Sequence, residues 1–153
     1  MLPVYTRSTV KLPAVPRRVI GIDLGARRIG VAVTDALGMT AHPQATIQRR
    51  GGQRDLDAIA ALVRVHDAER VVLGLPLSPE GEVGRAAASV QAFAARLRQA
   101  IDVPVDLIDE SFSTVEAEEV LLAADLSRAR RREVIDKVAA AVILRRWLDS
   151  NAR

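Results

Sequence analysis

The sequence predicts a mixed α/β sheet with helices on both faces, and two features of its apolar pattern carry this prediction. Near the start, two runs rich in β-branched residues, Val19 to Leu24 and Ile29 to Thr34, flank a short turn, which is typical of an antiparallel hairpin. From Arg54 onward, segments with helical spacing alternate with short apolar runs. Because alternating helices and strands favour parallel connections, both kinds of strand pairing are expected in one sheet.

A third strand is expected from Met39 to Gln48. It contains Pro43, which has no N–H for a sheet ladder, so this strand should lie at the edge. Residues 1–17 hold three prolines and no continuous apolar run, and we expect a poorly ordered extension there rather than a signal peptide. One folded domain should therefore span residues 18–150.

The second half of the chain supplies the alternating helices and strands. Apolar positions recur at helical spacing in its longer segments, whereas its short continuous apolar runs are typical of covered strands. Ser113-Thr114-Val115-Glu116 has the form of a capping box, which predicts a helix start. The expected elements are a helix from Arg54 to about His66, a strand from Val71 to Leu75, a loop from Pro76 to Gly84, a helix from Arg85 to Ala100, a strand from Val103 to Ile108, a helix to about Ala124 and a helix from Arg130 to Leu148.

The composition excludes several classes of function. The chain has no cysteine and only two histidines, which excludes disulfide frameworks, zinc–thiolate sites and histidine-rich metal sites. Any metal would be held by oxygen ligands, as Mg²⁺ or Mn²⁺ are. No apolar run approaches the ~20 residues that span a bilayer, so we expect a cytoplasmic protein without membrane partners.

Arginine supplies most of the positive charge, and its distribution is clustered. The formal net charge is only +3, but paired arginines suit contacts with phosphate groups. A solvated arginine-rich surface would give the same pattern, so the clusters alone do not decide between the two interpretations. The clusters are Arg17-Arg18, Arg27-Arg28, Arg49-Arg50 with Arg54, and Arg128 with Arg130-Arg131-Arg132.

Three carboxylates occupy unusual positions in the predicted elements. Asp23 lies within an apolar strand, where an unpaired carboxylate costs several kcal/mol unless a metal, a cation or hydrogen bonds compensate. Glu110 follows Asp109 at the end of the last strand, and Asp136 lies early in the last helix. Taken singly, Asp109 could be a turn residue and Asp136 a carboxylate favoured by the helix dipole. Together, the three positions predict a divalent-metal site.

The same residues carry a resemblance to a known family. In order and with ordinary spacing, the chain resembles the YqgF/RuvX family, whose members are named as Holliday junction resolvases and pre-16S rRNA nucleases. The resemblance covers about Arg18 to Ser150. It rests on Gly21-Ile22-Asp23-Leu24-Gly25, Arg28-Ile29-Gly30-Val31-Ala32, Gly74-Leu75-Pro76, Asp109-Glu110 with Ser113-Thr114, and Ile135-Asp136 before Ala139-Ala140-Ala141 and Ile143-Leu144.

This resemblance implies an RNase H-like fold with a five-stranded mixed sheet. It also implies a metal-dependent endonuclease whose catalytic and metal-binding residues are Asp23, Glu110 and Asp136, with Mg²⁺ or Mn²⁺ as cofactor. The substrate would be an rRNA precursor or branched DNA, bound by a monomer or a homodimer. The expected nucleic-acid contacts are Arg27, Arg28, Arg85, Arg130, Arg131 and Arg132.

One position departs from the family pattern. Ser111 stands where the family commonly has an arginine directly after the Asp-Glu pair, so a cation that faces phosphate is absent there. Arg27, Arg28 or the cluster at residues 130–132 could supply that charge.

Two other functions remain open at this stage. A non-catalytic ribosome-assembly or transcription factor could keep this fold and bind RNA through its arginines. The Asp-Leu-Gly turn also resembles the first phosphate motif of actin-like ATPases and sugar kinases, but those proteins enclose the nucleotide between two RNase H-like halves. The present chain has the length of one.

Overall fold

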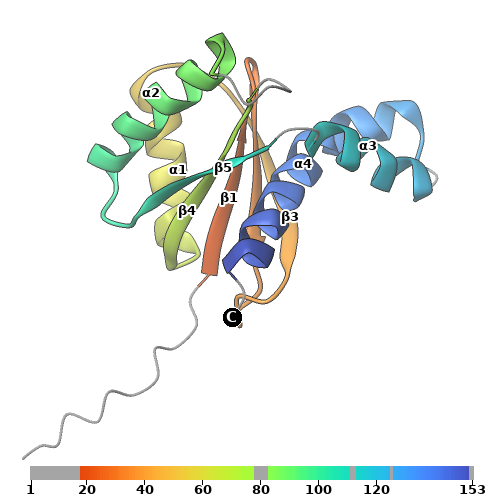
Figure 1. The fold of residues 1–153 in the computed structure, drawn as a ribbon, viewed down its shortest axis with the longest axis horizontal. Coiled ribbons are helices and arrows are strands. Elements are labelled where there is room, and N and C mark those ends of the chain that lie inside the picture. The colour runs from red at the N-terminus through yellow and green to blue at the C-terminus, as the bar shows by residue number, and fades with distance from the viewer. Residues whose placement is uncertain (1–17, 78–82, 111–112, 125, 152–153) are drawn as a thin grey trace, which may run out of the picture.

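The computed structural model describes residues 18–77, 83–110, 113–124 and 126–151 of the chain. It shows one five-stranded sheet, with α1 and α2 on one face, α4 across the other face, and α3 packed beside α4 (Figure 1). The strands are β1 (Arg18–Leu24), β2 (Arg28–Thr34), β3 (Ala41–Gln48), β4 (Ala68–Leu75) and β5 (Val105–Asp109). The helices are α1 (Gln53–Val65), α2 (Arg85–Ala100), α3 (Ser113–Ala123) and α4 (Arg128–Asn151).

The sheet is mixed, as predicted, and its strand order is β3-β2-β1-β4-β5. β1 and β2 form the predicted antiparallel hairpin, while β4 pairs with β1 and β5 with β4 in parallel. β3 lies at the edge, and Pro43 is accommodated next to a register shift. This strand begins at Ala41, two residues later than predicted, because the backbone N–H groups of Met39 and Thr40 donate to the Asp35 carboxylate.

The helices agree with the sequence pattern to within a few residues, and α2 has the predicted bounds. α4 is longer than predicted at both ends. Its start lies earlier because Ser127 acts as a cap, with its hydroxyl oxygen 3.2 Å from the backbone nitrogen of Arg130. The side chains of the predicted capping box at residues 113–116, the N-terminal extension, Ser111 and residues 78–82 of the predicted loop lie outside the described residues.

The two faces of the sheet differ in what covers them. Ile20, Ile22 and Leu73 point into a large apolar core beneath α1 and α2. Val19 points to the opposite face, which packs against small and aliphatic residues of α4. Because side chains alternate along a strand, Gly21 and Asp23 share the α4 face with Val19. The predicted Asp23 site therefore lies between the sheet and α4.

None of the helices within the described ranges is sufficiently long and apolar to cross a membrane.

Candidate active site

Glycines in neighbouring strands bring α4 close to the sheet at the candidate site. A Cβ atom on Gly30 would overlap the backbone carbonyl oxygen of Asp136, and one on Gly74 would lie 2.7 Å from Oε2 of Glu110. Gly21 faces Leu144 in the same way, at 2.8 Å from its Cβ. The close approach at these glycines was not predicted from the sequence, although an isolated glycine inside a strand indicates a close backbone approach.

The structure brings Asp23, Glu110 and Asp136 together. Asp23 is the next-to-last residue of β1 and pairs with Gly30, over which the Asp136 backbone lies. Glu110 directly follows β5, where its N–H donates to the carbonyl oxygen of Leu75 at 3.1 Å. Asp23 therefore has Glu110 and Asp136 as neighbours, each from an element that is distant in the sequence.

The surroundings of Asp23 change its protonation. Burial raises the pKa of this carboxyl to about 6; a side-chain hydrogen bond with Glu110 works to lower it, and the negative charge of Asp136 raises it further. Within the parts of the chain that the structure describes, no arginine or lysine forms an ion pair with Asp23. Among the described residues, the carboxylate inside the strand therefore has no cationic partner.

Asp136 has a different partner. Nε of Arg28 lies 2.7 Å from Oδ2 of Asp136, which links the start of β2 to α4. The Asp136 side chain is 19% exposed and that of Arg28 is 44% exposed. Arg28 thus neutralises one of the three carboxylates from the solvent side.

Within the described residues, no three acidic or histidine side chains are arranged closely enough to hold a metal ion. The donor set nevertheless suits a hard divalent cation, because all three groups are carboxylates and one of them is desolvated without a cation. A metal that binds Oδ2 of Asp136 would have to displace Arg28 from it.

The predicted nucleic-acid contacts are distributed over several surfaces. Arg27 and Arg85 are exposed, in the hairpin turn and at the start of α2. Arg130 is exposed on α4, whereas Arg131 is half-buried and donates to the carbonyl oxygen of Leu126 at 2.6 Å. The structure brings Arg28 and Arg132 to one cavity and leaves Arg27 and Arg85 outside it.

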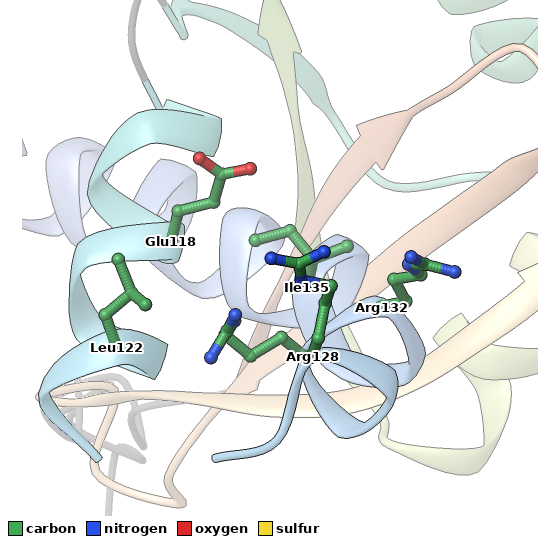
Figure 2. Close-up of a pocket in the computed structure, with 6 residues that line it drawn as sticks. Glu118, Leu122, Arg128, Arg132 and Ile135 are labelled. Atoms are coloured by element: carbon green, nitrogen blue, oxygen red, sulfur yellow. The ribbon is translucent and has the colours of Figure 1, made fainter. Parts of the chain in front are cut away.

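A separate cavity of about 300 Å³ lies between α3 and α4 (Figure 2). Arg128, Arg131 and Arg132 contribute positive charge to its lining, and Glu118 offsets part of that charge. In Figure 2, Arg132 lies on the side of α4 away from Glu118 and Leu122. Arg132 therefore connects this cavity with the sheet side of the helix.

Comparison with known proteins identifies the family of the chain. Residues 17–150 match the family RuvX, described as "Holliday junction resolvase". The chain belongs to the RuvX family. Two relatives, both named "Putative pre-16S rRNA nuclease", come from Syntrophomonas wolfei, with 46% identity over 88% of this chain and 96% of the relative, and Myxococcus xanthus, with 50% identity over 88% and 89%.

A solved structure supports the fold of this RuvX family member. RuvC of Thermus thermophilus, in complex with a Holliday junction substrate, has a TM-score of 0.50 and 20% identity, and the match covers 89% of this chain and 96% of RuvC. At that identity the likeness concerns the fold alone. The implied RNase H-like fold with a five-stranded mixed sheet is confirmed.

Proposed function

We propose that this protein is an endonuclease that uses Mg²⁺ or Mn²⁺ to hydrolyse phosphodiester bonds in structured nucleic acid. The observation that carries the proposal is the half-buried Asp23 carboxylate, which has a raised pKa and, among the described residues, has Glu110 and Asp136 as neighbours instead of a cation. A carboxylate with a purely structural role would be expected to have donors that stabilise its charge.

Asp23, Glu110 and Asp136 would hold the metal. When bound, the metal offsets the negative charge of the phosphate and favours attack by water. Asp23 and Asp136 are held in place by the sheet ladder and by the close approach of α4 at Gly30. Arg28, released from Asp136, would remain beside the site as a cation that faces phosphate.

The family and the names of its members support two substrate classes. The two relatives are named for pre-16S rRNA, and the family is named for Holliday junctions. We propose that the protein acts on one of these substrates in the cytoplasm. A four-way junction has two-fold symmetry and would suit a homodimer, whereas an RNA end requires only a monomer.

Cleavage assays with a matched pair of variants test this function. The purified protein is incubated with a synthetic four-way junction and with a pre-16S rRNA fragment, each with Mg²⁺, with Mn²⁺ and with EDTA. We expect metal-dependent cleavage of at least one substrate and a loss of about 100-fold or more in Asp23→Asn. Asp102→Asn, an exposed carboxylate before β5 at the opposite end of that strand from Glu110, is the control and should cleave normally.

Cleavage by Asp23→Asn at the wild-type rate would contradict the site assignment. Nucleic-acid binding that needs no metal, without cleavage of either substrate, would instead support the non-catalytic ribosome-assembly or transcription factor. Measurable ATP binding by titration calorimetry would support the actin-like nucleotide-binding alternative.

A further inference from the structure

A second cavity adjoins the candidate active site at the edge of the sheet. It has a volume of about 360 Å³ and is lined by Arg28 of β2, Thr46 and Gln48 of β3, and Arg132 of α4. In the antiparallel ladder, Thr46 pairs with Gly30 and Gln48 pairs with Arg28. Arg132 precedes Asp136 by four residues, so both lie on one face of α4, about one turn apart.

Thr46 has a polar atom that the protein leaves without a partner. Its Oγ1 is buried and has no hydrogen-bond partner among the residues that the structure describes. The neighbouring Ala45 and Ile47 pack into the core on the other face, so the Thr46 side chain faces α4. A buried hydroxyl without a hydrogen bond costs about 1–3 kcal/mol, so this hydroxyl gains free energy from any group that accepts its hydrogen bond.

The chemistry of the cavity is that of an anion site. Its lining residues offer two guanidinium groups, a hydroxyl and a carboxamide, and none of them is acidic. Guanidinium groups match the oxygens of phosphate in geometry and in charge. The cavity between α3 and α4 differs in this respect, because Glu118 lies among its arginines.

Arg28 joins the cavity to the carboxylates. Its guanidinium contacts Asp136 at 2.7 Å, and the same side chain lines the cavity. A phosphate held between Arg28 and Arg132 would therefore lie directly beside the candidate metal site. Among the described residues that line the cavity, none carries a carboxylate that would repel it.

We propose that Arg28, Thr46, Gln48 and Arg132 form a phosphate subsite that binds the backbone of the nucleic-acid substrate beside the bond to be cleaved. This assignment rests on the proposed nuclease function. It adds a binding site on β3, the edge strand, to the predicted arginine contacts. The Thr46 hydroxyl donates to a phosphate oxygen, and the two arginines flank the same group.

Binding measurements without metal test the subsite separately from catalysis. Fluorescence anisotropy with a labelled RNA stem-loop and a labelled four-way junction, in EDTA, compares the wild type with Arg132→Gln and Thr46→Val. We expect Arg132→Gln to weaken binding about tenfold and to reduce the salt slope by about 1, because one phosphate contact is lost. Thr46→Val keeps the shape of the side chain and should weaken binding about two- to fivefold. The control is Arg96→Gln, which changes an exposed residue of α2 on the opposite face of the sheet. This variant should bind nucleic acid as the wild type does.

Amide NMR shifts of Thr46 and Gln48 identify the source of the phosphate. Shifts on addition of the RNA or the junction, which the two substitutions weaken, support the subsite. Shifts with inorganic phosphate but not with either nucleic acid would overturn it in favour of a site for free phosphate.

The outcomes also separate this proposal from the nuclease function. Unchanged nucleic-acid binding by both variants would overturn the subsite even where Asp23→Asn abolishes cleavage. The wild type could also cleave neither substrate while Arg132→Gln and Thr46→Val both bind nucleic acid more weakly. That result would support the subsite and contradict the nuclease function.

Discussion

The buried carboxylate of Asp55 and the half-buried carboxylate of Asp23 have opposite surroundings. Asp55 lies in the first turn of α1 with 2% of its surface exposed. Its carboxylate accepts hydrogen bonds from the backbone N–H of Arg50 at 2.9 Å, the backbone N–H of Gly51 at 3.1 Å and Nε of Arg49 at 3.2 Å. Burial works to raise the pKa of Asp55, but these donors outweigh it and hold the pKa below its usual value.

Within the described parts of the chain, Asp23 has no comparable set of donors. Its neighbours include two further carboxyl groups, and burial raises its pKa to about 6. The comparison teaches how a structural carboxylate differs from a candidate functional one. Where a carboxylate serves to hold a loop against a helix, the surrounding backbone satisfies its charge; at Asp23 that charge is left for a ligand to satisfy.

The largest expected effect concerns Asp55→Asn. The amide would place N–H groups opposite at least one of the existing donors and would leave Arg49 without its buried anion. We expect a loss of about 3 kcal/mol in the free energy of unfolding, measured by urea denaturation at pH 7. Asp57→Asn, an exposed change two residues later, should stay within about 0.5 kcal/mol of the wild type. A loss below about 1 kcal/mol for Asp55→Asn would mean that its donors do not stabilise the loop.

The sequence could predict one member of this pair and not the other. Asp23 is conspicuous because it interrupts an apolar strand, and strand ends draw attention to Glu110. Asp55 looks like any acidic residue in a first helical turn, since its donors come from the backbone of a loop whose conformation the sequence does not specify. Similarly, the α/β alternation predicted the layers of the fold but not the close approach of α4 at Gly30.

Long-range pairing explains the rest of what could not be predicted. The Arg28–Asp136 ion pair joins residues that are 108 positions apart, so no local pattern contains it. Thr46 is an ordinary residue in an edge strand, and its hydroxyl becomes a buried atom without a partner among the described residues only in the folded chain, where α4 packs against β3. The sequence therefore located the carboxylates better than it located the groups around them.

The next effect in size concerns Asp23→Asn, and its sign is opposite to that of Asp55→Asn. In EDTA at pH 7, the substitution removes a desolvated charge, and we expect the protein to gain about 1–2 kcal/mol of stability. This is less than the full pKa shift would give, because Asp23 keeps part of its contact with solvent. Urea denaturation measures the gain. Addition of Mn²⁺ should stabilise the wild type more than Asp23→Asn, and equal stabilisation of both proteins would exclude Asp23 as a ligand.

The smallest expected effect is the pH dependence of that gain. Because the pKa of Asp23 is about 6 in the folded protein against 3.8 otherwise, the folded state binds more protons than the unfolded state between these values. The wild type therefore loses stability relative to Asp23→Asn as pH rises from about 4 to 6, by about 1 kcal/mol in all. The contribution of Asp55 to stability changes with pH in the opposite direction. Because its pKa is lowered in the folded protein, the stability that it contributes is lost as the pH falls.

The wild type and Asp23→Asn both retain Asp55. Subtracting the unfolding free energy of one protein from that of the other, in EDTA at each pH, therefore cancels the contribution of Asp55. A difference that stays constant between pH 4 and 7 would show that Asp23 does not titrate in this range. The carboxylate would then be as well satisfied as Asp55, and the contrast between the two sites would fail at its chemical basis.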